Sequence, residues 1–410
     1  MTLLPDSSPA ALPGLLADPP VVVLIVLVLC TAGWIALRGR ETAVACCGVV
    51  ALTGAGVIAP EQLPGAFVNG LTLLLLAAYI ASGLLRSSGL AARAIGRAMR
   101  GVDHFAALTR RLVWLILATA FVVPSTTGRA VLLLPVFLAL AAAMPSRRHA
   151  AALALLFPTT ILLSACAALT GAGAHLVAVD FIAMQGGRTV SWFDWLLFGL
   201  PFAATSCLVA ERLILTVALS PGERSRGVAL EWAAQTVAAS ERTASDRAAA
   251  VRAALRGIDW SVLLLVGCAI AIAEAVALSG FVDWLAARLP ALLPAVAASD
   301  RRFLVAAAVL IALLSHLLVP SRTARVTVLL PSLALPIVAL GADPVAPVLM
   351  LTMASGFCQL SPAGAKAMPI FGMLADPADV RRLGWLLLPP MFFIALGFAW
   401  FVWPLLGLRP

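Results

Sequence analysis

Two stretches of the sequence share one pattern, PSTTGRAVLLLP at residues 124–135 and PSRTARVTVLLP at residues 320–331. They align without a gap as P-S-x-T-x-R-x-x-x-L-L-P, so the chain contains an internal repeat. Proline, serine and threonine at the start of each copy are typical of a turn that leads into a helix. Each copy lies inside a long apolar run, and the length of these runs decides the fold.

The first copy interrupts the apolar run 112–144, which has basic residues before it (Arg110 and Arg111) and after it (Arg147 and Arg148). Basic residues favour the cytoplasmic side, so both ends of the run are expected there. A straight helix of this length would measure about 50 Å, too long for one crossing of a core of about 30 Å, and two crossings need about 40 residues. We therefore expect a re-entrant hairpin of two half-length helices whose tip, 124–128, is buried in protein or lines a cavity.

The second copy interrupts the run 303–340 and predicts a second hairpin with its tip at 320–324. An odd number of crossings separates the two hairpins, so the second one is expected to enter from outside, as in inverted repeats. The sequence thus predicts an all-α polytopic membrane protein. Its two inverted repeats are residues 1–219 and 258–410, and the polar segment 220–257 is the cytoplasmic linker between them.

Composition agrees with this class, because 62% of the residues are hydrophobic, 11% are charged and the mean hydropathy is +1.05. The net charge of +9 comes largely from arginines that flank apolar segments, which indicates membrane topology and no nucleic-acid partner. The arginines at 86–100 predict an amphipathic helix on the cytoplasmic surface. We expect a bacterial inner-membrane protein with both termini in the periplasm. Its predicted crossings are 21–37, 42–58, 71–85, 151–183, 195–219, 260–278, 348–374 and 385–403.

Two of these crossings contain corresponding helix-poor stretches. Residues 169–175, LTGAGAH, align with residues 360–366, LSPAGAK, and predict two broken transmembrane helices interrupted at 170–174 and 361–364. Both stretches end in a basic residue, His175 or Lys366. Lys366 is the only lysine of the chain, and it lies at predicted membrane depth.

Arg129, Arg325 and Lys366 each cost about 2.5 to 3.5 kcal/mol at the centre of a membrane helix, so something must offset their charge. One interpretation pairs them with Glu274 or with the carbonyl ends of half-helices. The other places them around an anion, which the N-terminal ends of the second hairpin arms also attract. Glu211 is expected to pair locally with Arg212 or to reach the interface.

The candidate residues therefore gather at the tips and the breaks. Tip hydroxyls either cap the half-helices or bind substrate. Glu274 and His316 are candidates for a proton relay, although a hydrogen-bonded buried histidine is the alternative for His316. The predicted substrate-binding residues are Ser125, Thr126, Thr127, Arg129, Thr170, His175, Ser321, Arg322, Thr323, Arg325, Ser361 and Lys366.

These features favour a secondary transporter or exchanger of small anions. An anion channel and a membrane-embedded enzyme are the alternatives. The enzyme is disfavoured because the chain has no H-E-x-x-H motif and no Ser-Lys pair at helical spacing. We expect no catalytic residue, no metal site and no organic cofactor.

The tips resemble the Ser-Asn-Thr signature tips of the divalent anion sodium symporter family, within the wider ion-transporter superfamily. Residues 52–69 and 88–93 are also similar, and the likeness runs from about residue 42 to the last span. The resemblance implies a homodimeric elevator transporter of di- or tricarboxylates or sulfate, in which hairpins and broken helices move against a scaffold. In that family the tips bind the substrate and shape two sodium sites, and the corresponding positions are 125–127 and 321–323.

The sequence departs from the family in ways that bear on sodium. Thr126 and Arg322 stand where the family has asparagines, and Arg129 and Arg325 stand where it usually has small polar residues. A guanidinium at such a position would replace a bound sodium ion, so we expect transport without sodium. The second half also lacks two helices that precede its hairpin in the family, which alters the scaffold.

Overall fold

The computed structural model describes residues 18–37, 39–87, 101–186, 189–227, 252, 255–292, 300–339, 341–361, 365 and 367–408. In this part of the chain the regular structure is helical, apart from one isolated bridge between His104 and Gly227. Six described helices are long and apolar enough to cross a membrane by length and composition. They are Pro19–Ala36, Pro60–Leu84, Arg147–Ala167, Trp192–Ala218, Trp260–Leu278 and Pro377–Leu405. The predicted all-α polytopic membrane fold is confirmed.

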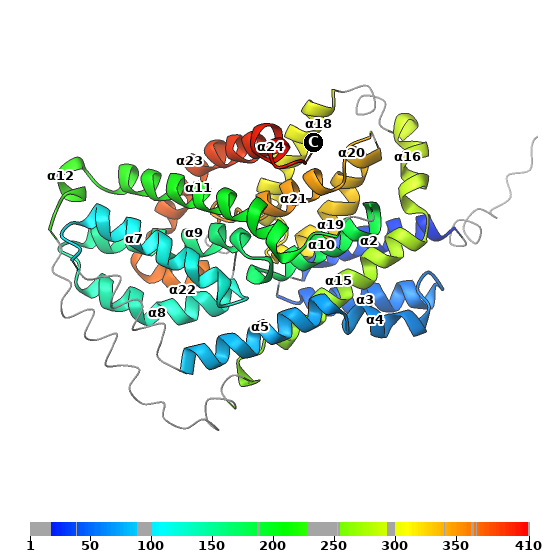
Figure 1. Ribbon diagram of the computed structural model, residues 1–410, viewed down its shortest axis with the longest axis horizontal. Coiled ribbons are helices and arrows are strands. Elements are labelled where there is room, and N and C mark those ends of the chain that lie inside the picture. Colours follow the sequence, from blue (N-terminus) through cyan, green and yellow to red (C-terminus); the bar gives the residue numbers. More distant parts are fainter. Residues whose placement is uncertain are drawn as a thin grey trace, which may run out of the picture.

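One group of helices surrounds α15, which spans Trp260–Leu278 as predicted and packs closely on α3 and α4. The predicted crossing 42–58 is the shorter α3, whose 14 residues fall below the length of a full span. Figure 1 shows α3, α4, α5 and α15 along one side of the molecule. The remaining members of this α15 group are α2 (Pro19–Ala36), α3 (Glu41–Gly54), the turn Pro60–Gln62, α4 (Leu63–Phe67), α5 (Gly70–Ser87) and α16 (Phe281–Leu292).

The first predicted hairpin consists of α7 (Phe105–Ala118), a short turn (Thr119–Phe121) and α8 (Thr126–Ala142). Ser125 caps α8, because its Oγ accepts a hydrogen bond from the Gly128 amide at 3.2 Å. The first arm begins seven positions before the predicted start, at Phe105 in place of residue 112, so its arginines lie inside the helix.

An ion pair with a buried carboxylate fixes that arm and corrects one expectation. Arg110 Nη2 lies 2.7 Å from the Glu211 carboxylate of α11, and the Thr109 hydroxyl donates to the same carboxylate at 2.9 Å. The prediction that Glu211 pairs locally with Arg212 or reaches the interface was wrong, because the fold brings α7 against α11 and buries the carboxylate between them.

The second hairpin contains α18 (Arg301–Leu314), the turn Ser315–Leu317, α19 (Arg322–Leu329), a π-helical turn (Leu330–Ala334) and α20 (Leu335–Ala339). Ser321 caps α19 by accepting from the Ala324 amide at 3.4 Å. In Figure 1, α7 and α8 lie toward one end of the molecule and α18 and α20 toward the other. The inverted-repeat relationship of the two halves stays a prediction.

Both predicted broken helices are interrupted, but earlier than expected. The first consists of α9 (Arg147–Ser164), two short turns (Ala165–Ala167 and Leu169–Gly171) and α10 (Gly173–Gly186), and the second of α21 (Val345–Ala354), α22 (Met368–Phe371) and the turn Gly372–Leu374. The helices end at Ser164 and Ala354, before the predicted breaks at 170–174 and 361–364, and residues 362–364 lie outside the described residues. Helix-poor residues mark only the later part of each interruption.

One long helix packs against each break: α11 (Trp192–Ala218) on the first and α23 (Pro377–Gly397) on the second. Beyond α23 the chain continues as a π-helical turn (Phe398–Val402) and α24 (Trp403–Leu405). Glycines allow the close approach. A Cβ on Gly199 would lie 2.2 Å from the Cys166 carbonyl oxygen, and one on Gly384 would lie 2.4 Å from that of Gln359. We call the two hairpins, the two broken helices, α11 and α23 the hairpin group.

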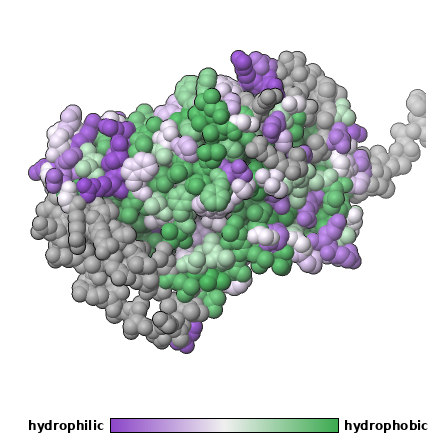
Figure 2. Space-filling model, viewed as in Figure 1, coloured by the Kyte–Doolittle hydropathy of each residue, from purple (hydrophilic) through white to green (hydrophobic). Residues whose placement is uncertain are grey.

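The start of the linker docks on the base of the first hairpin through α12 (Pro221–Arg224). The Phe105 amide donates to the Arg226 carbonyl at 3.1 Å, and His149 Nε2 lies 2.9 Å from the Glu223 carbonyl oxygen. The amide and hydroxyl of Ser220 donate to the Glu223 carboxylate and hold the pKa of that carboxyl below its ordinary value. Most of the linker and of the predicted surface helix at 86–100 lies outside the described residues. Figure 2 shows hydrophilic residues toward both ends and a hydrophobic region between them, as expected for a protein that crosses a membrane.

Candidate functional site

A cavity of about 130 Å³ lies where the two hairpin tips meet. Residues 124–127 of the first tip and 320–323 of the second line it, together with Arg325. Both helix breaks also contribute, through Ala172 and Gly173 of the first and Gly356, Cys358 and Ala365 of the second. The α15 group closes the cavity with Glu41, Tyr79, Asp259 and Val262.

The fold therefore brings most of the predicted tip residues to one place. Thr126 and Thr127 follow the capping Ser125 in the first turn of α8, so they lie at a helix N-terminus that faces the cavity. Arg322 and Thr323 follow the capping Ser321 in the first turn of α19, so they lie at a second helix N-terminus beside the cavity. The predicted residues that line the cavity are Ser125, Thr126, Thr127, Ser321, Arg322, Thr323 and Arg325.

Arg322 is the cavity-lining arginine with the most unused donors. Its Nη2 donates to the Thr352 carbonyl at 3.0 Å and lies 3.2 Å from Cys166 Sγ, which joins the tip to both breaks. Its Nε and Nη1 are buried and have no hydrogen-bond partner among the described residues. Since a buried donor without a partner is costly, the guanidinium is poised to receive an acceptor from a ligand.

Arg325 uses most of its donors within the protein. Its Nη1 donates to the carbonyls of Val319 and Pro320 at 2.8 and 3.0 Å, and its Nη2 donates to the Ser355 carbonyl at 2.7 Å and lies 3.1 Å from Cys358 Sγ. It lines the cavity, and its Nε has no partner among the described residues. The side chain thus joins the end of the first hairpin arm to the end of α21.

Arg129 makes the corresponding contacts in the first half. Its Nη2 donates to the Ile116 carbonyl at 2.9 Å and to the Ser164 hydroxyl, its Nη1 to the Ile161 carbonyl at 3.0 Å, and its Nε to Thr119 Oγ1 at 3.0 Å. It is fully buried and does not line the cavity. These contacts correspond to the interpretation in which the arginine pairs with half-helix carbonyls, whose free oxygens carry partial negative charge.

The other predicted residues lie away from the cavity lining. His175 is buried, stacks on Trp195 with ring centroids 4.7 Å apart, and its Nδ1 donates to the Ala168 carbonyl at 3.0 Å. His316 is buried too, and its Nδ1 donates to the Leu313 carbonyl at 2.8 Å. Lys366 lies outside the described residues. The remaining predicted residues that do not line the cavity are Thr170, Glu274 and Ser361.

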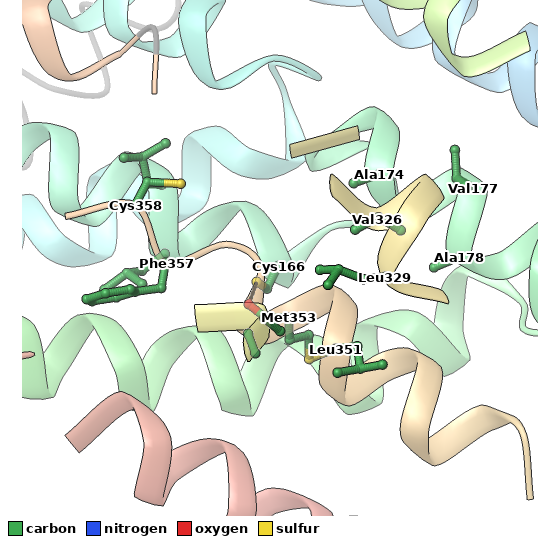
Figure 3. Close-up of a cluster of buried hydrophobic side chains, with 14 of the residues drawn as sticks. Cys166, Ala174, Val177, Ala178, Val326, Leu329, Leu351, Met353, Phe357 and Cys358 are labelled. Atoms are coloured by element: carbon green, nitrogen blue, oxygen red, sulfur yellow. Dashed lines mark hydrogen bonds between the residues drawn. The ribbon is translucent and has the colours of Figure 1, made fainter. Parts of the chain in front are cut away.

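Apolar packing behind the tips holds the two breaks together. Figure 3 shows Cys166 of the first break beside Met353 of α21, with Phe357 and Cys358 of the second break nearby. The Cys166 thiol lies 3.9 Å from the Met353 carbonyl oxygen. This cluster positions the Cys166 sulfur and the Thr352 carbonyl, which contact Arg322 Nη2.

Among the unpredicted cavity residues are the three ionisable ones of the α15 group. Glu41 begins α3 and Asp259 caps α15, and neither position carries a motif. Tyr79 is the single tyrosine of the chain, and it is buried beside Ser125. The sequence offered two signals for these residues. Tyr79 is the single tyrosine, and Glu41 and Asp259 lie directly before apolar runs.

Comparison with known proteins shows which families this chain is similar to. The family described as citrate transporter matches residues 23–226, and the family described as sodium:sulfate symporter transmembrane region matches residues 256–409. No curated protein matches the chain. A multi-pass helical fold with two hairpin tips at one internal cavity defines a membrane transporter. Each half of the chain is thus similar to an ion-transporter family of the divalent anion sodium symporter type.

A solved structure supports the fold independently. The YdaH transporter of Alcanivorax borkumensis, described as having an unusual topology, is 15% identical to this chain, with a TM-score of 0.54. The match covers 95% of this chain and 99% of that chain, so the shared fold extends over nearly the whole of both molecules.

Proposed function

We propose that the protein is a secondary active transporter or exchanger of small organic or inorganic anions in the bacterial inner membrane, with both termini in the periplasm. The observation that carries this proposal is the cavity between the two tips, which is lined by Arg322, a side chain with two buried donors that have no partner among the described residues. The matched families, described as transporters of citrate and of sulfate, support an anion as the substrate.

Anion binding in the cavity uses three kinds of group. An oxygen of a carboxylate or sulfate accepts a charge-assisted hydrogen bond from Arg322 Nε or from Nη1, which lie on different edges of the guanidinium. The first turns of α8 and α19 add the positive ends of two helix dipoles. The hydroxyls of Thr126, Thr127 and Thr323 supply short neutral donors at the same place.

Transport without sodium fits the contacts of the other two tip arginines. Arg129 and Arg325 each donate to carbonyl oxygens at the ends of a hairpin arm and a broken helix. Hard cations such as sodium bind oxygen ligands of this kind, as calcium and magnesium do. We propose that these guanidinium groups are permanent counter-cations in place of bound sodium ions.

The position of the cavity suits an elevator movement. The tips and breaks of the hairpin group form one part of its lining, and Glu41, Tyr79 and Asp259 of the α15 group form the other. In the proposed cycle the hairpin group carries the anion across the membrane against the α15 group, which a homodimer holds in place. Saturable exchange without electrical conductance would distinguish this cycle from an anion channel.

Uptake by proteoliposomes tests the proposal. Wild-type protein should accumulate a labelled anion from a panel of mono-, di- and tricarboxylates, with and without an amine, and sulfate, and uptake should persist when choline replaces sodium. Arg322→Gln should reduce uptake by at least about tenfold, whereas the control Arg382→Gln, an exposed arginine of α23, should transport normally. Absence of uptake for every anion, or normal uptake by folded Arg322→Gln, would refute it.

A further inference from the structure

A largely buried glutamate lines the cavity from the α15 group. Glu41 is only 6% exposed and lines the cavity. Its backbone carbonyl accepts from Trp34 Nε1 at 2.9 Å, but its carboxylate has no hydrogen bond or ion pair with the described residues. A buried charged carboxylate is unfavourable unless a cation or a proton compensates it.

A second acid lies on the same side of the cavity. Asp259 is half-buried, and its Oδ1 accepts from the Val262 amide at 3.2 Å, so the N-terminus of α15 compensates part of its charge. The positive dipole at the start of α3 acts on Glu41 in the same way, but supplies it with no direct donor. Glu41 is therefore the cavity carboxylate that most needs a cationic partner.

The charges of the cavity are divided between its two parts. The second tip supplies the guanidinium of Arg322, whose Nε and Nη1 have no partner among the described residues, and α3 and α15 supply Glu41 and Asp259. A plain dicarboxylate fits this division poorly, because its second carboxylate meets two acids and most donors of Arg325 are already used. A molecule with a carboxylate and a protonated amine satisfies both parts. The volume of about 130 Å³, well below the roughly 300 Å³ of a small drug site, limits it to a few carbons.

We propose that the substrate is a small amphoteric carboxylate, whose carboxylate binds Arg322 and whose protonated amine binds Glu41. This inference rests on the proposed anion transport and narrows its substrate class. The carboxylate of Glu41 would also bind a free cation, sodium or a proton, that enters together with a plain anion. The experiment below distinguishes a positive charge on the substrate from a free cation.

Matched ligands test the role of Glu41. Aspartate and succinate share a four-carbon dicarboxylate skeleton and differ by one amine, and 4-aminobutyrate and butyrate differ in the same way. Binding affinities are measured for purified protein at constant sodium and pH. Wild type should bind the amine-bearing member of each pair at least about tenfold more tightly, and Glu41→Gln should reduce that ratio to about one. Glu41→Asp keeps the charge and should retain a preference. Glu61→Gln, the same change at an exposed site outside the cavity, should leave the ratio unchanged.

Two results would overturn the inference. The first is equal or tighter binding of succinate and butyrate by wild type, or an unchanged ratio in Glu41→Gln that elutes and melts as a folded protein. The second is binding of plain anions that depends on sodium or pH in wild type and loses this dependence in Glu41→Gln, which would assign Glu41 to a free cation. In both cases anion binding that still requires Arg322 would leave the proposed transport intact, whereas the absence of all anion binding would defeat the transport proposal itself.

Discussion

The three arginines of the tips do not share one environment. The two that the repeat pattern aligns have similar partners, and the third differs from them. Arg129 and Arg325, the repeated pair, donate mainly to carbonyl oxygens at helix ends. Arg322, which aligns with Thr126 of the first tip, lines the cavity and has two buried donors without a partner among the described residues. The repeat predicted where the arginines lie along the chain. It did not predict their partners, because those depend on where α9 and α21 end.

The carbonyl contacts of Arg325 lead to a test with sodium. Arg325→Ala removes the guanidinium and leaves the carbonyls of Val319, Pro320 and Ser355 without their donor, so the melting temperature in choline should fall. Sodium should restore part of the loss, because the exposed oxygens suit a small cation. Thermal unfolding in sodium and in choline measures both effects. A fall that sodium leaves unchanged would argue against a counter-cation role.

At the scale of elements, the sequence predicted both hairpins and both broken helices, because apolar length and the interrupting Pro, Ser and Gly residues are visible in it. It placed the breaks too late, at 170–174 and 361–364, although the helices end at Ser164 and Ala354. The early ends contain ordinary helix formers such as Ala165 and Cys166. Tertiary contacts take carbonyls at the end of α9, since Arg129 donates to the Ile161 carbonyl and Trp195 Nε1 donates to the Cys166 carbonyl at 2.9 Å.

Because α23 lies in close contact with the second break, a methyl group added to α23 should lower stability at the contact and not elsewhere on the helix. Gly384→Ala places a Cβ 2.4 Å from the Gln359 carbonyl oxygen, so the backbone must move, and stability should fall by about 1–3 kcal/mol. Gly397→Ala, at the end of the same helix, meets nothing within 4 Å and should be neutral or stabilising by about 0.4–1 kcal/mol. Thermal unfolding of the two variants checks this. Equal stability of the pair would contradict the packing described for the break.

At the scale of the whole molecule, the membrane class, the joining of the tips and the family could be predicted from the sequence. The contribution of the α15 group to the cavity could not, because Glu41, Tyr79 and Asp259 reach it only through the packing of α3, α5 and α15 on the hairpin group. Two of the eight predicted crossings, 42–58 and 348–374, contain only helices shorter than a full span among the described residues. The polar linker 220–257 carries no repeat and lies mostly outside the described residues.

Inverted topology makes a prediction for the entire fold. A cysteine at Arg147, the first residue of α9, should react with a membrane-impermeant reagent only from the cytoplasm, and one at Arg301, at the start of the second hairpin, only from the periplasm. Both positions are exposed, and labelling of the seven native cysteines in wild type gives the background. Reaction of both sites from the same side would show that the hairpins enter from one face.

The central claim is that Arg322 binds the anion while Arg129 holds the fold together, and paired substitutions test it most directly. Ligand affinity and melting temperature are measured for folded Arg322→Gln and Arg129→Gln with the anion that wild type binds most tightly. The account predicts that Arg322→Gln loses affinity by about tenfold or more at nearly unchanged stability. Arg129→Gln should lose about 3 kcal/mol of stability, because four buried contacts are broken, and keep wild-type affinity in the protein that remains folded. Wild-type affinity in Arg322→Gln, or a selective loss of affinity in a stable Arg129→Gln, would contradict it.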